Sequence, residues 1–122
     1  MKYYYEKRAY GRAYLPLKHH ITVISYEECS PAIRPATGID IACGGILIET
    51  KHRYSIGSKL TLIMHLPINE NDKYLKMEAV VVRVKKLPYG NFETGLGFFS
   101  DILPGDQNHI LQYVYYHRRT AM

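Results

Sequence analysis

Asp40-Ile41-Ala42-Cys43-Gly44-Gly45 runs directly into the apolar segment Ile46-Leu47-Ile48. The stretch places one carboxylate beside small side chains and a glycine pair, within an otherwise strand-like segment. Glycines inside a strand mark a bulge, or a place where a ligand or another backbone approaches closely. We therefore predict a strand that begins at Ile39, is interrupted at Gly44 and Gly45, and resumes from Ile46 to Thr50.

A second informative stretch, Arg8-Ala9-Tyr10-Gly11-Arg12, carries two guanidinium groups on a segment that Gly11 allows to turn. A guanidinium binds a phosphate, or the O6 and N7 acceptors of guanine, through two parallel hydrogen bonds. The Asp40 carboxylate complements the N1–H and N2 donors of the same base, and small residues leave room for it. Each stretch alone is more often a solvated charge pair or a turn. Together they indicate a pocket for an anionic purine ligand.

Composition limits the alternatives. With 122 residues the chain is long enough to bury a core as one domain without disulfides or metal. The two cysteines form no disulfide framework, and the start, Met1-Lys2-Tyr3-Tyr4-Tyr5, lacks the apolar region of a signal peptide. No apolar run approaches the length of a membrane span, so a cytoplasmic location is expected. The net charge of +5 favours an anionic partner.

Alternation of apolar and polar residues predicts further strands at 19–26, 60–66, 74–87 and 92–100. Prolines 31 and 35 and the glycine at 38 predict a loop or hairpin connection over 27–38. In the strand at 60–66, one face carries Leu60, Leu62, Met64 and Leu66.

The C-terminal segment has helical periodicity. Pro104 suits the first helical position, and Ile110, Leu111 and Val114 follow at helical spacing. We predict a mainly β protein, a small antiparallel barrel with a packed C-terminal helix. Residues 1–122 form one domain: an arm over 1–12 that becomes ordered on binding, a barrel over 13–101 and a helix over 104–119.

The two motifs, in this order and followed by this strand pattern, resemble the PilZ domain family. The family signature is R-x-x-x-R followed by D/N-x-S/A-x-x-G; Arg8 and Arg12 match the first part, and Asp40, Ala42 and Gly45 match the second. The resemblance extends from about Lys7 to Arg119. It implies a six-stranded antiparallel barrel that binds the bacterial second messenger cyclic di-GMP.

The resemblance also implies roles for single residues. Arg8 and Arg12 would clamp the ligand, and Asp40, Ala42 and Gly45 would form its seat. Ala42 stands where the family commonly has Ser, which removes one hydroxyl hydrogen bond. Lys7 occupies a position that influences whether one ligand or a stacked pair binds, and a basic residue there favours the pair. The predicted ligand-binding residues are Lys7, Arg8, Arg12, Asp40, Ala42, Gly44, Gly45 and Gly97.

We find no pattern that predicts catalysis, a cofactor or a metal site. The histidines and cysteines lack C-x-x-C or H-x-x-x-H spacing, and there is no nucleophile elbow or phosphate-binding glycine loop. The expected partners are cyclic di-GMP and an unidentified protein, with no DNA and no membrane insertion; a homodimer stays open. Two alternatives also stay open: a PilZ-like adaptor without nucleotide binding, for example in motility or pilus assembly, and a small basic barrel that stacks its tyrosines on single-stranded nucleic acid.

Overall fold

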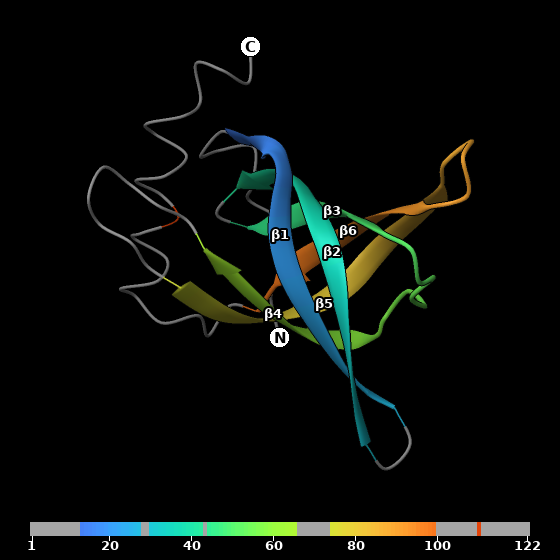
Figure 1. The fold of residues 1–122 in the computed structure, drawn as a ribbon. Helices are drawn as coiled ribbons and strands as arrows, with labels where there is room; N and C mark the ends of the chain where they lie inside the picture. Colours follow the sequence, from blue (N-terminus) through green and yellow to red (C-terminus); the bar gives the residue numbers. More distant parts are fainter. Residues whose placement is uncertain (1–12, 28–29, 43, 66–73, 100–109, 111–122) are drawn as a thin grey trace.

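A computed structural model describes residues 13–27, 30–42, 44–65, 74–99 and 110 (Figure 1). It contains six strands in a closed barrel with the order β1-β2-β3-β6-β5-β4, and every neighbouring pair is antiparallel. The strands are β1 (Ala13–Glu27), β2 (Ser30–Ala42), β3 (Gly45–Thr50), β4 (Lys59–His65), β5 (Tyr74–Lys86) and β6 (Phe92–Phe98). The six-stranded antiparallel barrel of the sequence prediction is thereby confirmed.

The two ends of the chain are described less fully. The predicted arm over 1–12 lies outside the described residues. The predicted helix over 104–119 also lies outside them, apart from Ile110, whose side chain is buried in the core. Neither prediction is therefore tested.

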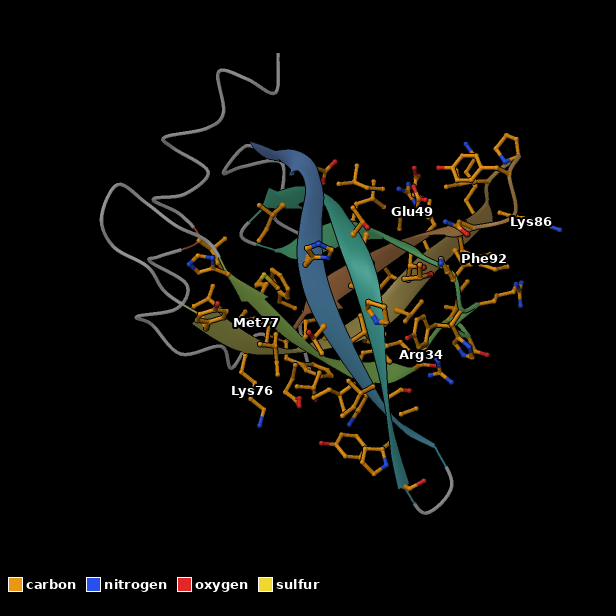
Figure 2. All side chains as sticks on the ribbon, viewed as in Figure 1. Arg34, Glu49, Lys76, Met77, Lys86 and Phe92 are labelled. Carbon is orange, nitrogen blue, oxygen red and sulfur yellow. The ribbon has the colours of Figure 1, made fainter. Side chains whose placement is uncertain are left out.

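The barrel interior is built from alternate residues of the strands, as the apolar periodicity predicts. Leu60, Leu62 and Met64 of β4 are all buried, which confirms the face predicted for them; the fourth member, Leu66, lies outside the described residues. On β5, Met77 is buried in the core while its neighbour Lys76 is exposed (Figure 2).

The prediction of a loop or hairpin connection over 27–38 is wrong in its extent, because β2 starts at Ser30, pairs with β1 from there and continues through both prolines. Within the part of the chain that the structure describes, the segment of β2 before Thr37 pairs only with β1, since the pairing with β3 starts at Thr37. Pro31 and Pro35 therefore lie where the second edge of β2 has no neighbour among the described strands, and a missing N–H on that edge breaks no ladder bond between them. Because Pro31 and Pro35 are four residues apart in β2, their backbone nitrogens lie on the same edge of the strand, and both are compatible with it.

β1 and β2 continue beyond the other strands as a two-stranded ribbon (Figure 1). The pairing of β1 with β4 ends at Ser25, whereas its pairing with β2 continues to Glu27 and Ser30. Residues 22–25 therefore still lie in a three-stranded region, β2-β1-β4. Among the described residues, only the pairs Tyr26–Pro31 and Glu27–Ser30 lie beyond β4.

The connection between β3 and β4 closes one end of the barrel. In the barrel order β6 and β5 lie between these strands, so residues 51–58 must cross the barrel end. Tyr54, in the middle of the connection, belongs to the hydrophobic core, and its ring contacts His52 edge-on at 4.7 Å between centroids. The connection ends in a turn in which Gly57, at φ +93°, donates its N–H to the Val81 carbonyl at 2.7 Å.

A polar pair lies inside this end of the barrel. The Thr50 hydroxyl donates to the His52 carbonyl at 2.8 Å and lies 3.0 Å from the Thr94 hydroxyl, with both threonine side chains buried. Because a hydroxyl has one proton, the Thr94 hydroxyl must be the donor to Thr50. The two threonines thus fix the start of the 51–58 connection to β6.

Candidate functional site

A bulge in β2 determines where the Asp40 side chain lies. Gly38 pairs with Ile48 of β3, but Asp40 pairs with Leu47, so Ile39 is an extra residue in β2. In an unbroken strand Asp40 would share the inner face with Gly38. The extra residue moves it to the outer face, because directly paired residues share a face and Leu47 in turn pairs with Gly95 of β6.

The predicted interruption at Gly44 and Gly45 is a chain reversal and not a bulge within one strand. Ala42 pairs with Gly45, so only residues 43 and 44 connect β2 to β3. The Gly44 carbonyl accepts a hydrogen bond from the Phe98 N–H at 3.0 Å, which holds the turn against β6. The glycine pair therefore belongs to a tight hairpin, and the bulge lies nearer the start of the motif, at Ile39.

Small residues form a continuous row across the outer face beside Asp40. Ala42 pairs with Gly45, Gly45 with Gly97, and Gly97 with Val80 of β5. We call Ala42, Gly45, Gly95 and Gly97 the small-residue floor. Without side chains beyond Cβ, Ala42, Gly45 and Gly97 let a flat group approach the backbone closely. The Arg83 side chain lies over Gly95, with its Cβ 3.5 Å and its Nε 3.8 Å from the place that a Cβ on Gly95 would take.

The structure thus brings five of the predicted ligand-binding residues together: Asp40, Ala42, Gly44, Gly45 and Gly97. Asp40 is only 7% exposed although it is charged and lies on the outer face. The other three, Lys7, Arg8 and Arg12, lie outside the described residues. The start of β1 nevertheless relates them to the site, because Ala13 pairs with Ile41 and Tyr14 with Asp40. Arg12 is bonded to Ala13, so the two Cα atoms are about 3.8 Å apart.

Two cations that the sequence analysis missed lie at the β5 and β4 side of the floor. Arg83 pairs with Gly95, and its side chain is 57% exposed with Nη2 4.0 Å from Glu93 Oε1. Lys59 pairs with Val80, and its Nζ lies 5.6 Å from the centre of the Phe99 ring. Through successive strand pairs, Arg83 lies in line with Asp40 and Lys59 lies in line with Ala42. Only the strand register shows this alignment, because nothing in the sequence around either residue predicts it.

A second carboxylate, that of Glu49 on β3, forms its hydrogen bonds with residues outside the small-residue floor. It accepts hydrogen bonds from the Tyr89 hydroxyl and the Asn91 amide, both at 2.8 Å, near Phe92 and Lys86 (Figure 2). The hydrogen bond to Glu49 raises the pKa of Tyr89 above its ordinary value of 10.0. Glu49 therefore stabilises the turn between β5 and β6, whereas Asp40 lies beside the floor.

Other kinds of site find no support in the described part of the chain. Within those residues no group of three or more His, Cys, Asp or Glu side chains is placed to hold a metal ion. The same residues include no helix with the length and apolar character needed to cross a membrane.

Comparison with known proteins gives consistent matches. The model of the PilZ domain family matches residues 6–116. MotI/DgrA, the inhibitor of motility of Bacillus subtilis, is similar in structure with a TM-score of 0.68 and 27% identity, over 91% of this chain and 50% of that one. The chain thus spans about half the length of that relative. No match was found among curated proteins.

Two further similar structures contain cyclic di-GMP (c-di-GMP). The PilZ domain of YcgR from Escherichia coli with c-di-GMP matches with a TM-score of 0.65 and 11% identity, over 90% of each chain. The MrkH–c-di-GMP complex of K. pneumoniae matches with a TM-score of 0.63 and 17% identity, over 85% of this chain and 49% of that one. Together with the six-stranded barrel, the family match over nearly the whole chain shows that this protein belongs to the PilZ domain family.

Proposed function

We propose that the protein is a non-catalytic receptor for cyclic di-GMP. The observation that carries the proposal is the bulge at Ile39, which turns Asp40 onto the outer face beside the small-residue floor. Arg12 follows one peptide bond from Ala13, whose partner is Ile41. In our proposal the Asp40 carboxylate accepts from the guanine donors and the Arg12 guanidinium donates to phosphate. The two residues belong to neighbouring strand segments, because Tyr14, two residues after Arg12, pairs with Asp40. Family membership and the ligand-bound YcgR and MrkH structures support the same ligand.

In this proposal each residue has a distinct task. Arg8 and Arg12 bind phosphate and the guanine O6 and N7 edge. Asp40 accepts hydrogen bonds from guanine N1–H and N2. Ala42, Gly44, Gly45 and Gly97 allow the base to lie close to the backbone, and Lys7 favours binding of a stacked pair of ligands.

Substitution of Arg12 tests the proposal directly. Arg12→Ala is expected to weaken cyclic di-GMP binding about 10-fold or more, since a bidentate guanidinium contact is worth about 1–3 kcal/mol. Isothermal titration calorimetry measures the affinity and also the number of ligands per protomer. Arg53→Ala is the matched control, because it removes an exposed arginine from the 51–58 connection at the other end of β3 and should leave the affinity unchanged.

Absence of saturable binding by the wild-type protein would contradict the receptor proposal and leave the adaptor without nucleotide binding. Equal affinity for linear oligonucleotides and cyclic di-GMP, with steep salt dependence, would instead favour the single-stranded nucleic-acid alternative.

We further propose that ligand binding orders residues 1–12 and that the ordered arm presents a surface to a partner protein. Similarity to MotI, an inhibitor of motility, supports action through a partner. Saturating cyclic di-GMP is expected to slow tryptic cleavage after Lys7, Arg8 and Arg12, as followed by mass spectrometry of the released peptides. Cleavage after Lys51 serves as the internal control. Equal cleavage of the arm with and without bound ligand would contradict the ordering step.

A further inference from the structure

A second bulge, in β5, places Arg83 on the outer face of the barrel. Leu96 of β6 pairs with Val81, but its neighbour Gly95 pairs with Arg83, so Val82 is an extra residue in β5. Val81 is buried in the core, and in an unbroken strand Arg83, two residues later, would share that inner face. The extra residue turns Arg83 to the outer face instead, where its side chain is 57% exposed.

The bulges in β2 and β5 act on the two ends of one row of residues. Asp40 pairs with Leu47, Leu47 with Gly95, and Gly95 with Arg83. Without the bulge in its own strand, each of the two charged residues would lie on the inner face. Bulges often turn a single side chain toward a binding site. These two place a hydrogen-bond acceptor and a hydrogen-bond donor at opposite ends of the same outer row.

The Arg83 side chain extends from β5 over the neighbouring strand β6. Its Nε lies 3.8 Å from the place that a Cβ on Gly95 would take. Its Nη2 lies 4.0 Å from Glu93 Oε1, which is longer than a hydrogen bond. An ion pair of this length on an exposed side chain contributes little to stability. The guanidinium can therefore exchange this contact for a stronger acceptor on the floor.

The row leaves space for a planar base between the two charged groups. Two strands, β3 and β6, lie between β2 and β5, and neighbouring strands are about 4.8 Å apart. Three such steps separate the Cα atoms of Asp40 and Arg83 by about 14 Å along the sheet. The adjoining row contains Gly45 and Gly97, which have no side chain. A base on this part of the floor has one edge toward Asp40 and another toward Arg83.

Guanine has complementary groups for both residues. In the proposed function its N1–H and N2 donors bind Asp40, so the O6 and N7 acceptors of the same base still need donors. A guanidinium donates two parallel hydrogen bonds to these two acceptors. Adenine carries an amino donor in place of O6. An arginine at the far end of the row therefore favours guanine over adenine.

We propose that Arg83 binds the O6 and N7 edge of the guanine that Asp40 holds and contributes to the selection of guanine. The inference rests on the proposed function and deepens it, because it assigns base specificity to a residue outside both sequence motifs. Arg8 and Arg12 then bind phosphate and the second guanine of the ligand.

Isothermal titration calorimetry with cyclic di-GMP tests the proposal on three variants. Arg83→Ala is expected to weaken binding about 10-fold or more, as the loss of a bidentate contact does. Arg83→Lys keeps the charge but not the planar pair of donors, so it should lose a large part of the same affinity. Lys76→Ala is the matched control and should bind like the wild type, because it removes an exposed cation of β5 that pairs with Ile63 of β4 (Figure 2).

An analogue of cyclic di-GMP with 7-deazaguanine bases, which lack the N7 acceptor, identifies the edge that Arg83 contacts. The wild type should bind this analogue about 10-fold more weakly than cyclic di-GMP, because a hydrogen bond to a charged group is lost. The penalty should be smaller in Arg83→Ala, since the donor is already absent there. A difference between the two penalties measures the coupling between N7 and the guanidinium.

The outcomes distinguish this inference from the proposed function. Absence of cyclic di-GMP binding by the wild type would overturn both. Wild-type binding with an unchanged affinity of Arg83→Ala would overturn the inference alone. Equal losses in Arg83→Ala and Lys76→Ala would indicate a general effect of charge, and equal penalties for the analogue would assign N7 to another donor; either result overturns the role of Arg83. Urea unfolding confirms that each variant is folded, which is expected for exposed side chains.

Discussion

The Asp40→Asn variant is expected to bind cyclic di-GMP at least about 100-fold more weakly than the wild type, because hydrogen bonds to charged groups contribute about 1.5–3 kcal/mol each. In our proposal the carboxylate accepts two such bonds from one guanine edge. Asparagine keeps one acceptor and turns an amide N–H toward the second guanine donor, so one attraction becomes a repulsion. Calorimetry with cyclic di-GMP gives the ratio of dissociation constants.

The direction of this change distinguishes hydrogen bonding from net charge. Cyclic di-GMP is an anion, so removal of a negative charge close to it should by itself strengthen binding. Glu49→Gln provides that comparison, because Glu49 lies two residues after Leu47, the partner of Asp40. We expect Glu49→Gln to bind with unchanged or slightly higher affinity. A loss seen only with Asp40→Asn therefore assigns the effect to the carboxylate as an acceptor.

Two results would contradict the role of Asp40. One is unchanged affinity of Asp40→Asn in a variant that unfolds in urea like the wild type. The other is an equal loss in Asp40→Asn and Glu49→Gln, which would indicate a general effect on the outer face. Because asparagine has nearly the shape of aspartate, a large loss of stability is not expected.

Much of the barrel was predictable because apolar residues recur at every second position along strands such as β4, although Thr61 between Leu60 and Leu62 is buried as well. Leu60, Leu62 and Met64 are buried at every second position, and this period alone distinguishes a strand with one buried face from a helix. The position of Gly95 and Gly97 opposite Leu96 was predictable for the same reason. The local sequence pattern predicts a strand where one face of that strand lies in the core and the other faces outward along its length.

β2 was not predictable from local pattern. Pro31 and Pro35 normally indicate a loop, and they are compatible with a strand because one edge of β2 has no neighbour there among the described strands. The bulge at Ile39 was missed for a related reason. A bulge is a difference in register between two strands, so residues 38–40 do not reveal it without the pairing to β3.

The candidate site was predictable in part. The order and spacing of the motifs identified Asp40, Ala42 and Gly45, which the structure places on adjoining strands. Arg83 and Lys59 were not identified, because they reach the same rows only through the pairing of β5 with β6 and β4. Residues on a β surface that are distant in sequence come together through register, and a single sequence does not state the register.

Tyr54→Ala is expected to destabilise the fold by about 3–5 kcal/mol, the usual range for truncation of a buried aromatic side chain. Tyr54 is 4% exposed and packs in the core from a connection that crosses the end of the barrel. Such a loss is a large part of the roughly 5–15 kcal/mol by which domains are stable. Urea unfolding of the variant and the wild type measures it.

Tyr54→Phe separates ring packing from the hydroxyl group, and we expect it to retain most of the stability that Tyr54→Ala loses. Tyr54 belongs to the connection after Thr50, whereas the small-residue floor begins at Gly45, at the other end of β3. The folded fraction of Tyr54→Ala should therefore bind cyclic di-GMP with wild-type affinity. A loss below about 1 kcal/mol would mean that the barrel end collapses around the cavity and that Tyr54 is not needed to close it.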